Sequence, residues 1–89
     1  MNKGERKKRI EQAIIQFLSP THFSVEDKSA DHRGHSHAPQ EGESHYNIMI
    51  KSHKFIGKSR IVRERIVQKL LYDEFKSGLH ALSMHLEPP

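Results

Sequence analysis

The order of helical and alternating spacings of apolar residues constrains the fold of this chain more than any other feature. A first stripe has the roughly 3.6-residue period of a helix and predicts an amphipathic helix over about residues 4–18; its members are Ile10, Ala13, Ile14, Phe17 and Leu18. A second stripe predicts a helix with Ser59 as its N-cap and Ser77-Gly78 as its C-cap; it comprises Val62, Ile66, Val67, Leu70, Leu71 and Phe75. Arg63 falls in the middle of this stripe, so either the helix is bent or restarted near Arg63, or the side chain snorkels to the edge.

Three shorter segments alternate with period two and predict strands at about 22–27, 44–52 and 79–86. In the last of them His80 shares a face with Leu82, Met84 and Leu86. The first two strands are expected to be neighbours joined by the long, His-rich loop 28–43. The resulting order, α-β-β-α-β, predicts an α+β fold with the helices on one face of a three-stranded sheet.

Eighty-nine residues suit a single domain over 1–89, and the chain has no cysteine. Disulfides and Cys-ligated metal sites within the chain are therefore excluded. No run of apolar residues reaches the roughly 18–20 needed to span a bilayer, and no secretory or transit pattern stands at the start. We therefore expect a cytoplasmic protein that does not enter a membrane.

The net charge of +4 is concentrated in two basic regions. Residues 1–10 hold five basic residues against one acidic, and residues 51–69 hold seven against one. Basic side chains oppose the dipole in the first turns of a helix, so either residues 1–8 fray or their charges make a contact. The second region fits nucleic acid or an acidic protein partner, or is simply a solvated face.

Eight histidines supply the candidate metal ligands, because imidazole binds borderline metals near neutral pH. His32, His35 and His37 lie close enough in sequence to converge on one ion, although a polar loop can be His-rich without binding metal. His80 is either a histidine at the edge of the core or a ligand, and periodicity alone leaves both open.

Catalytic patterns are weak in this sequence, and we expect no enzyme. The Gly57-Lys58-Ser59 triplet is similar to the end of a phosphate-binding loop, but Ser52 stands where that loop requires glycine.

Three ordered motifs resemble the BolA family. The segment from Phe55 to Arg65 reads FIGKSRIVRER and resembles the family signature F-x-G-K-S-x-x-x-R-H-R. LHALS, from Leu79, resembles its V-H-A-L-S strand, and ESHY, from Glu43, its E-S-H-F motif. The resemblance covers Arg9 to Leu86, with Glu64 in place of the central histidine of R-H-R.

This resemblance implies a class II KH-like fold with a mixed sheet, and a non-enzymatic partner of a monothiol glutaredoxin. Family members share a bridging [2Fe-2S] cluster with the glutaredoxin thiolate and glutathione, in iron–sulfur trafficking or iron regulation. The family's histidine ligand matches His80, and its loop ligand matches His32, with His35 as the substitute. A weak homodimer is also compatible with the family.

Two other functions stay open. A DNA- or RNA-binding transcriptional regulator would use the basic patch 51–69, with Lys58, Arg60, Arg63 and Arg65 as contacts. Its aromatic stacking residues are few, and the G-x-x-G clamp of KH domains is missing. Alternatively, the histidine loop alone stores or senses a metal.

Overall fold

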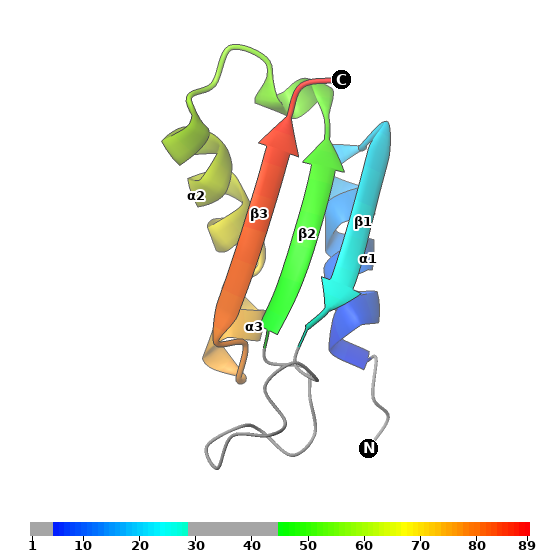
Figure 1. Cartoon of the computed structure of the whole chain (residues 1–89), viewed down its shortest axis with the longest axis vertical. Coiled ribbons are helices and arrows are strands. Elements are labelled where there is room, and N and C mark those ends of the chain that lie inside the picture. The colour runs from blue at the N-terminus through cyan, green and yellow to red at the C-terminus, as the bar shows by residue number, and fades with distance from the viewer. Residues whose placement is uncertain (1–4, 29–44) are drawn as a thin grey trace.

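A three-stranded sheet organises the chain, of which the computed structural model describes residues 5–28 and 45–89. Its elements are α1 (Glu5–Leu18), β1 (His22–Asp27), β2 (His45–Lys51), the 3-10 helix η2 (His53–Phe55), α2 (Arg60–Leu70), α3 (Tyr72–Lys76) and β3 (Ala81–Glu87). The central strand β2 runs antiparallel to β1 and parallel to β3 (Figure 1). The predicted α+β fold with a three-stranded mixed sheet is confirmed.

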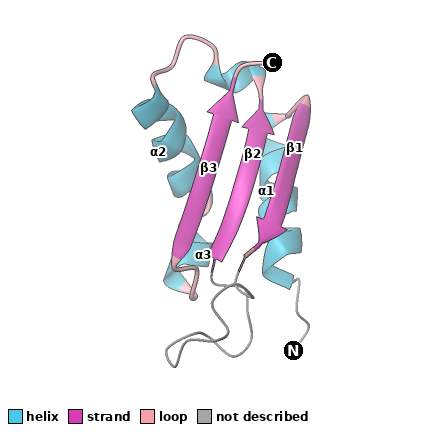
Figure 2. Cartoon of the chain, viewed as in Figure 1, coloured by secondary structure: helices cyan, strands magenta, loops and turns pink. Residues whose placement is uncertain are grey.

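One face of the sheet is covered by α1 and α2, and the described residues leave the other face open (Figure 2). Alternate residues of β2 point to the covered face, where Tyr46, Ile48 and Ile50 are each at most 3% exposed. They pack against the buried residues of the helices and of the other strands, namely Ile10, Ile14, Leu18, Val25, Phe55, Val67, Leu71 and Leu79. Most residues of the two predicted helical stripes therefore form the core together with the inner side chains of the strands. Phe17 and Val62 were expected there as well, but they are 56% and 39% exposed.

The basic start of α1 makes a contact within the fold. Arg6 precedes Ile10 and Ile14 at four-residue spacing and is buried with them. Its guanidinium bonds Glu74 of α3, as does that of Arg9. The basic first turns of α1 were expected either to fray or to make a contact, and for Arg6 and Arg9 the structure shows a contact.

The helix α2 begins as predicted and is not restarted near Arg63, so the alternative interpretation, a side chain that snorkels to the edge, is confirmed. The Ser59 hydroxyl accepts a hydrogen bond from the Val62 amide at 3.2 Å, and the helix continues unbroken to Leu70. Arg63 reaches the edge of the sheet instead, where it donates from Nε to the Lys58 carbonyl (2.9 Å) and from Nη1 to the Leu86 carbonyl (3.0 Å). The helical path is interrupted only at Leu71, where α3 follows α2.

The strand β3 begins two residues later than predicted, at Ala81. Leu82, Met84 and Leu86 face the core as expected, but His80 does not share their face. The chain is still leaving the α3 turn at Leu79 and His80, so the alternation does not extend back to them. Leu79 is buried and His80 is exposed.

None of the helices in residues 5–28 and 45–89 has the length and apolar composition of a membrane-spanning segment.

Candidate functional site

His80 is presented to solvent by the turn between α3 and β3. This turn closes α3 through Ser77, whose amide donates to the Asp73 and Glu74 carbonyls, and the Leu79 amide donates to the Glu74 carbonyl at 2.9 Å. Gly78 has a φ of +128°, a conformation that side chains other than glycine's rarely allow. The turn anchors Leu79, 3% exposed, in the core, and the next side chain therefore projects outward.

Arg6 fixes this turn from α1. Its Nη1 donates to the Glu74 carbonyl and to the Ser77 hydroxyl, both at 2.9 Å, and its Nη2 donates to the Ser77 carbonyl at 3.1 Å. A methyl group added at Gly78 would lie 3.2 Å from Nη2, so glycine also makes room for the guanidinium. The position of His80 thus depends on a contact between residues more than sixty positions apart in sequence.

Beside this turn, the negatively charged carboxylate of Glu74 forms salt bridges with two arginines. Arg9 Nε lies 2.7 Å from Oε2, and Arg6 Nη1 lies 2.9 Å from Oε1. The hydrogen bond from Arg9 and the positive charges of both arginines lower the pKa of Glu74 below its usual value, against the opposing effect of burial. Glu74 is therefore an ionised structural partner of the arginines.

A second imidazole, that of His45, lies beside His80. Their ring centroids are 6.1 Å apart and the ring planes are tilted by 32°. His45 is the first residue of β2 and pairs in register with Ala81, the first residue of β3. Because β2 and β3 are parallel, their first residues meet at the same end of the sheet.

His45 was not among the ligands predicted from the sequence. The available signal was that ESHY and LHALS each place a histidine at the start of a predicted strand. Only the parallel pairing of these two strands brings the histidines together.

Both ends of the His-rich segment lie at this same end of the sheet. The Lys28 amide donates to the His45 carbonyl at 2.7 Å, which joins the residue after β1 to the first residue of β2. His32 and His35 themselves lie outside the described residues. Among the residues that are described, no group of three or more histidine or acidic side chains could hold a metal ion.

The four residues predicted to bind nucleic acid differ in their surroundings. Lys58 and Arg65 are exposed. Arg60 pairs with Glu64, with Nε 3.2 Å from Oε2, so the residue that departs from the family motif neutralises part of the patch. Arg63 is bound to two backbone carbonyls. The structure thus leaves two of the four side chains without a competing contact among those described.

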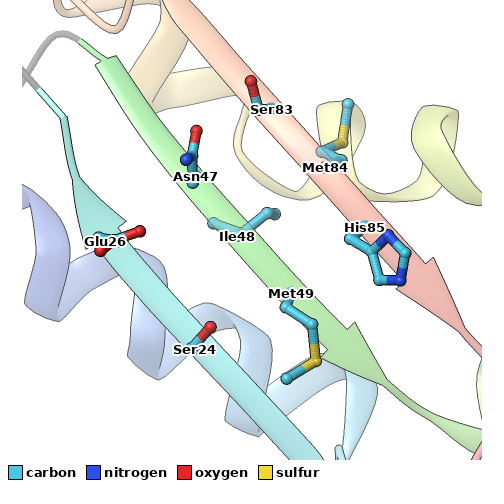
Figure 3. A pocket seen from close by; sticks show the side chains of 8 residues that line it. All are labelled: Ser24, Glu26, Asn47, Ile48, Met49, Ser83, Met84 and His85. Carbon is cyan, nitrogen blue, oxygen red and sulfur yellow. The ribbon is translucent and has the colours of Figure 1, made fainter.

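The open face of the sheet carries a shallow hollow of about 470 Å³. Figure 3 shows the residues that line it, which come from all three strands. Ser24, Glu26, Asn47, Met49, Ser83 and His85 alternate there with Ile48 and Met84, whose side chains belong to the core side of the sheet. The His85 Nε2 atom lies 3.0 Å from Glu87 Oε2. His85 is four residues beyond Ala81, the first residue of β3.

Known proteins similar to this chain share its fold. The family model described as "BolA-like protein" matches residues 14–89. SufE-like protein 1, chloroplastic/mitochondrial, from Arabidopsis thaliana is 43% identical over 97% of this chain, and Protein BOLA1, chloroplastic, from the same plant is 35% identical over 94%. The chain spans only 24% and 54% of these two longer proteins.

Solved structures agree with these sequence matches. The BolA domain of SufE1 from Arabidopsis thaliana superimposes with a TM-score of 0.86 at 43% identity, covering 97% of this chain and 94% of that domain. BolA1 from Arabidopsis thaliana gives 0.84 at 34% identity, covering 96% and 93%. On its sequence and on its fold, the chain belongs to the BolA-like protein family.

Proposed function

We propose that this chain is a non-enzymatic partner of a monothiol glutaredoxin and shares a bridging [2Fe-2S] cluster with it through His80, in iron–sulfur cluster trafficking or iron regulation. The observation that carries the proposal is the exposed His80 imidazole at the end of the sheet where the His-rich segment also begins and ends. Exposure matters because a bridging ligand must be reachable by the partner protein.

The donor set of the chain fits a shared cluster. It contains no cysteine, so every thiolate must come from the glutaredoxin and from glutathione. Imidazole nitrogen can replace thiolate on one iron of a [2Fe-2S] cluster, where it raises the reduction potential. One fixed, exposed imidazole is too little to hold a cluster alone, and this favours binding between two proteins.

His32 is the proposed second ligand, and His35 is its substitute. The hydrogen bond from Lys28 to His45 supports this assignment, because it ties both ends of segment 29–44 to the end of the sheet at which His80 lies. A residue a few positions beyond Lys28 needs only a short path back to His80.

Reconstitution with a monothiol glutaredoxin, glutathione, ferrous iron and sulfide tests the proposal. Visible absorption should report a cluster in the mixed complex whose spectrum differs from that of the glutaredoxin alone. His80→Ala should remove this difference. His85→Ala is the matched control, because His85 is an exposed histidine on β3, five residues after His80, and it should leave the spectrum intact. Equal spectra for wild type and His80→Ala would reject His80 as a ligand.

Nucleic-acid binding is the second candidate function. It is favoured by the exposed Lys58 and Arg65 and by one relative, 29% identical, whose name is "DNA-binding transcriptional regulator BolA" from Escherichia coli. Binding to DNA at low salt should weaken steeply as salt rises, and should weaken on changing Lys58 or Arg65. Absence of retention on DNA or RNA at low salt would reject it.

The cytoplasmic location and a weak homodimer stay predictions. Two relatives have chloroplast locations in their names, so localisation of the tagged protein is the direct measurement for the first. Sedimentation of the free chain over a range of concentrations measures the second.

A further inference from the structure

We propose that a groove between α1 and α2 binds a short acidic segment of a partner protein that carries large apolar side chains. The groove has a volume of about 330 Å³, near the lower limit of ligand pockets. Four apolar residues and three lysines line it: Phe17, Leu18, Ile66, Leu70, and Lys54, Lys58, Lys69. This proposal does not depend on the cluster function proposed above.

The apolar part of the groove remains accessible in the folded chain. Phe17 belongs to the predicted core stripe of α1, yet it is 56% exposed. Ile66 and Leu70 touch the core with one side and remain partly exposed on the other. Val62 extends their row by one helical turn and is 39% exposed. An exposed aromatic beside an aliphatic row is typical of a surface that binds an apolar anchor.

The lysines surround this apolar surface with positive charge. Lys54 and Lys58 come from the segment between β2 and α2, and Lys69 comes from the last turn of α2. Within residues 5–28 and 45–89, the three ammonium groups form no salt bridge. The surrounding region 51–69 holds one acidic residue, Glu64, and it is paired with Arg60. A ligand with carboxylates therefore meets uncompensated positive charge.

The combination favours an acidic, amphipathic peptide over other anions. Phosphates of a nucleic acid could meet the lysines but would leave the aliphatic row unused. A lipid alkyl chain would remain largely in water, because Phe17, which forms one wall of the groove, is itself 56% exposed and cannot enclose the chain. A helix or extended segment can place one or two apolar anchors on the row and its carboxylates against the lysines.

The groove and the His80 end can be occupied at the same time. Lys54 and Lys58 follow the last residue of β2, whereas His80 lies beside the first. The seven residues of β2 separate the two ends by about 20 Å at the usual rise per residue. The acidic segment would thus bind away from the proposed cluster.

Titration of the ¹⁵N-labelled chain with a capped, twelve-residue peptide tests the proposal. The peptide carries two leucines four positions apart among glutamates. One control peptide replaces the leucines with serine, and a second replaces the glutamates with glutamine. We expect the acidic leucine peptide to shift the amides of Phe17, Lys58 and Lys69, with an affinity that falls as salt increases.

Variants of the chain locate the binding surface. Lys58→Glu combined with Lys69→Glu should weaken binding roughly tenfold or more, and Phe17→Ser should weaken it severalfold. Lys8→Glu is the matched control, since it reverses an exposed lysine on α1 about two and a half turns before Phe17 and should change the affinity less than about twofold.

Three results would overturn the proposal. The first is no shift at these amides with the acidic leucine peptide at millimolar concentration. The second is equal binding of the serine peptide, which would mean charge attraction without an apolar site. The third is a short DNA duplex that shifts the same amides when the peptide does not, which would make the groove a nucleic-acid surface.

Discussion

Replacing Glu74 with glutamine should destabilise the fold strongly, because this carboxylate neutralises a buried arginine. Side chains of Arg6 and Glu74 are only 10% and 12% exposed, so the pair is largely removed from water. Glutamine keeps the size of the side chain and one carbonyl acceptor, but it removes the charge. The substitution therefore tests the ion pair with little change in packing.

The magnitude follows from what remains around Arg6. Removal of one partner of a fully buried ion pair costs about 3–5 kcal/mol. Arg6 would keep three acceptors, the Glu74 carbonyl and the two oxygens of Ser77, and Arg9 is 49% exposed and can be hydrated. We therefore expect a loss of about 2–3 kcal/mol in the free energy of unfolding at pH 7, or roughly 10–20 °C in Tm for a domain of this size.

The effect should depend on pH in one direction. The pKa of Glu74 is lower in the folded chain than its ordinary value of 4.5, because of the hydrogen bond from Arg9 and the nearby positive charges. A carboxyl group of this kind contributes its full stabilisation above the unfolded pKa and loses it as pH falls through the folded pKa. The difference between wild type and Glu74→Gln should thus be constant above about pH 5 and shrink below pH 4.5.

Urea denaturation followed by circular dichroism from pH 3 to pH 7 measures both effects. Glu64→Gln is the matched control: its partner Arg60 is 88% exposed, and exposed i, i+4 pairs contribute about 0.3–0.5 kcal/mol. The reasoning is refuted if Glu74→Gln costs no more than this control, or if its cost is the same at pH 3 as at pH 7.

Two further substitutions test contacts that position the groove and the sheet. Ser52→Ala should cost about 1–3 kcal/mol in urea denaturation, because the fully buried hydroxyl donates to the Leu18 carbonyl and accepts from the Lys54 amide. If Ser52→Ala were as stable as the wild type, the assigned hydrogen bonds would not stabilise the fold as predicted. Arg63→Lys should cost about 1–2 kcal/mol, because an ammonium cannot reproduce the two guanidinium bonds to backbone carbonyls. Its thermal unfolding midpoint should fall below that of Arg65→Lys, which replaces an exposed arginine; equal midpoints would contradict the assigned contact.

The regular elements could be predicted because each has an apolar period that matches its buried face. The strand β1 has the predicted bounds, and β2 and α1 differ by one residue at their ends. The Ser59 cap was predictable because its side chain acts on the next turn of its own helix. These features depend on neighbours in sequence.

Features that depend on distant partners were not predictable. From the sequence alone Arg6 resembles a solvated surface charge, because its partner Glu74 lies far away in the chain, on α3. For Arg63 the sequence left two interpretations open, an interrupted helix or a side chain that snorkels to the edge, and the Leu86 carbonyl at the sheet edge decides for the second. Phe17 fits the same core stripe as Ile14 and Leu18, yet these two are buried and Phe17 is 56% exposed.

The candidate site likewise combines features that depend on neighbours in sequence with features that depend on distant partners. His80 was found from its motif, although its side chain lies outside the apolar stripe to which periodicity assigned it. His45 required the parallel register of β2 and β3, which pairs it with Ala81. His32 and His35 stay predictions.

Pulsed electron paramagnetic resonance of the reduced cluster tests the central claim most directly. The chain is labelled with ¹⁵N-histidine, reconstituted with an unlabelled monothiol glutaredoxin and glutathione, and then reduced. Coordination by His80 predicts a strong ¹⁵N coupling that is lost or reduced in His80→Ala and retained in His85→Ala. A cluster that shows no ¹⁵N coupling, or a coupling unchanged by His80→Ala, would contradict the account.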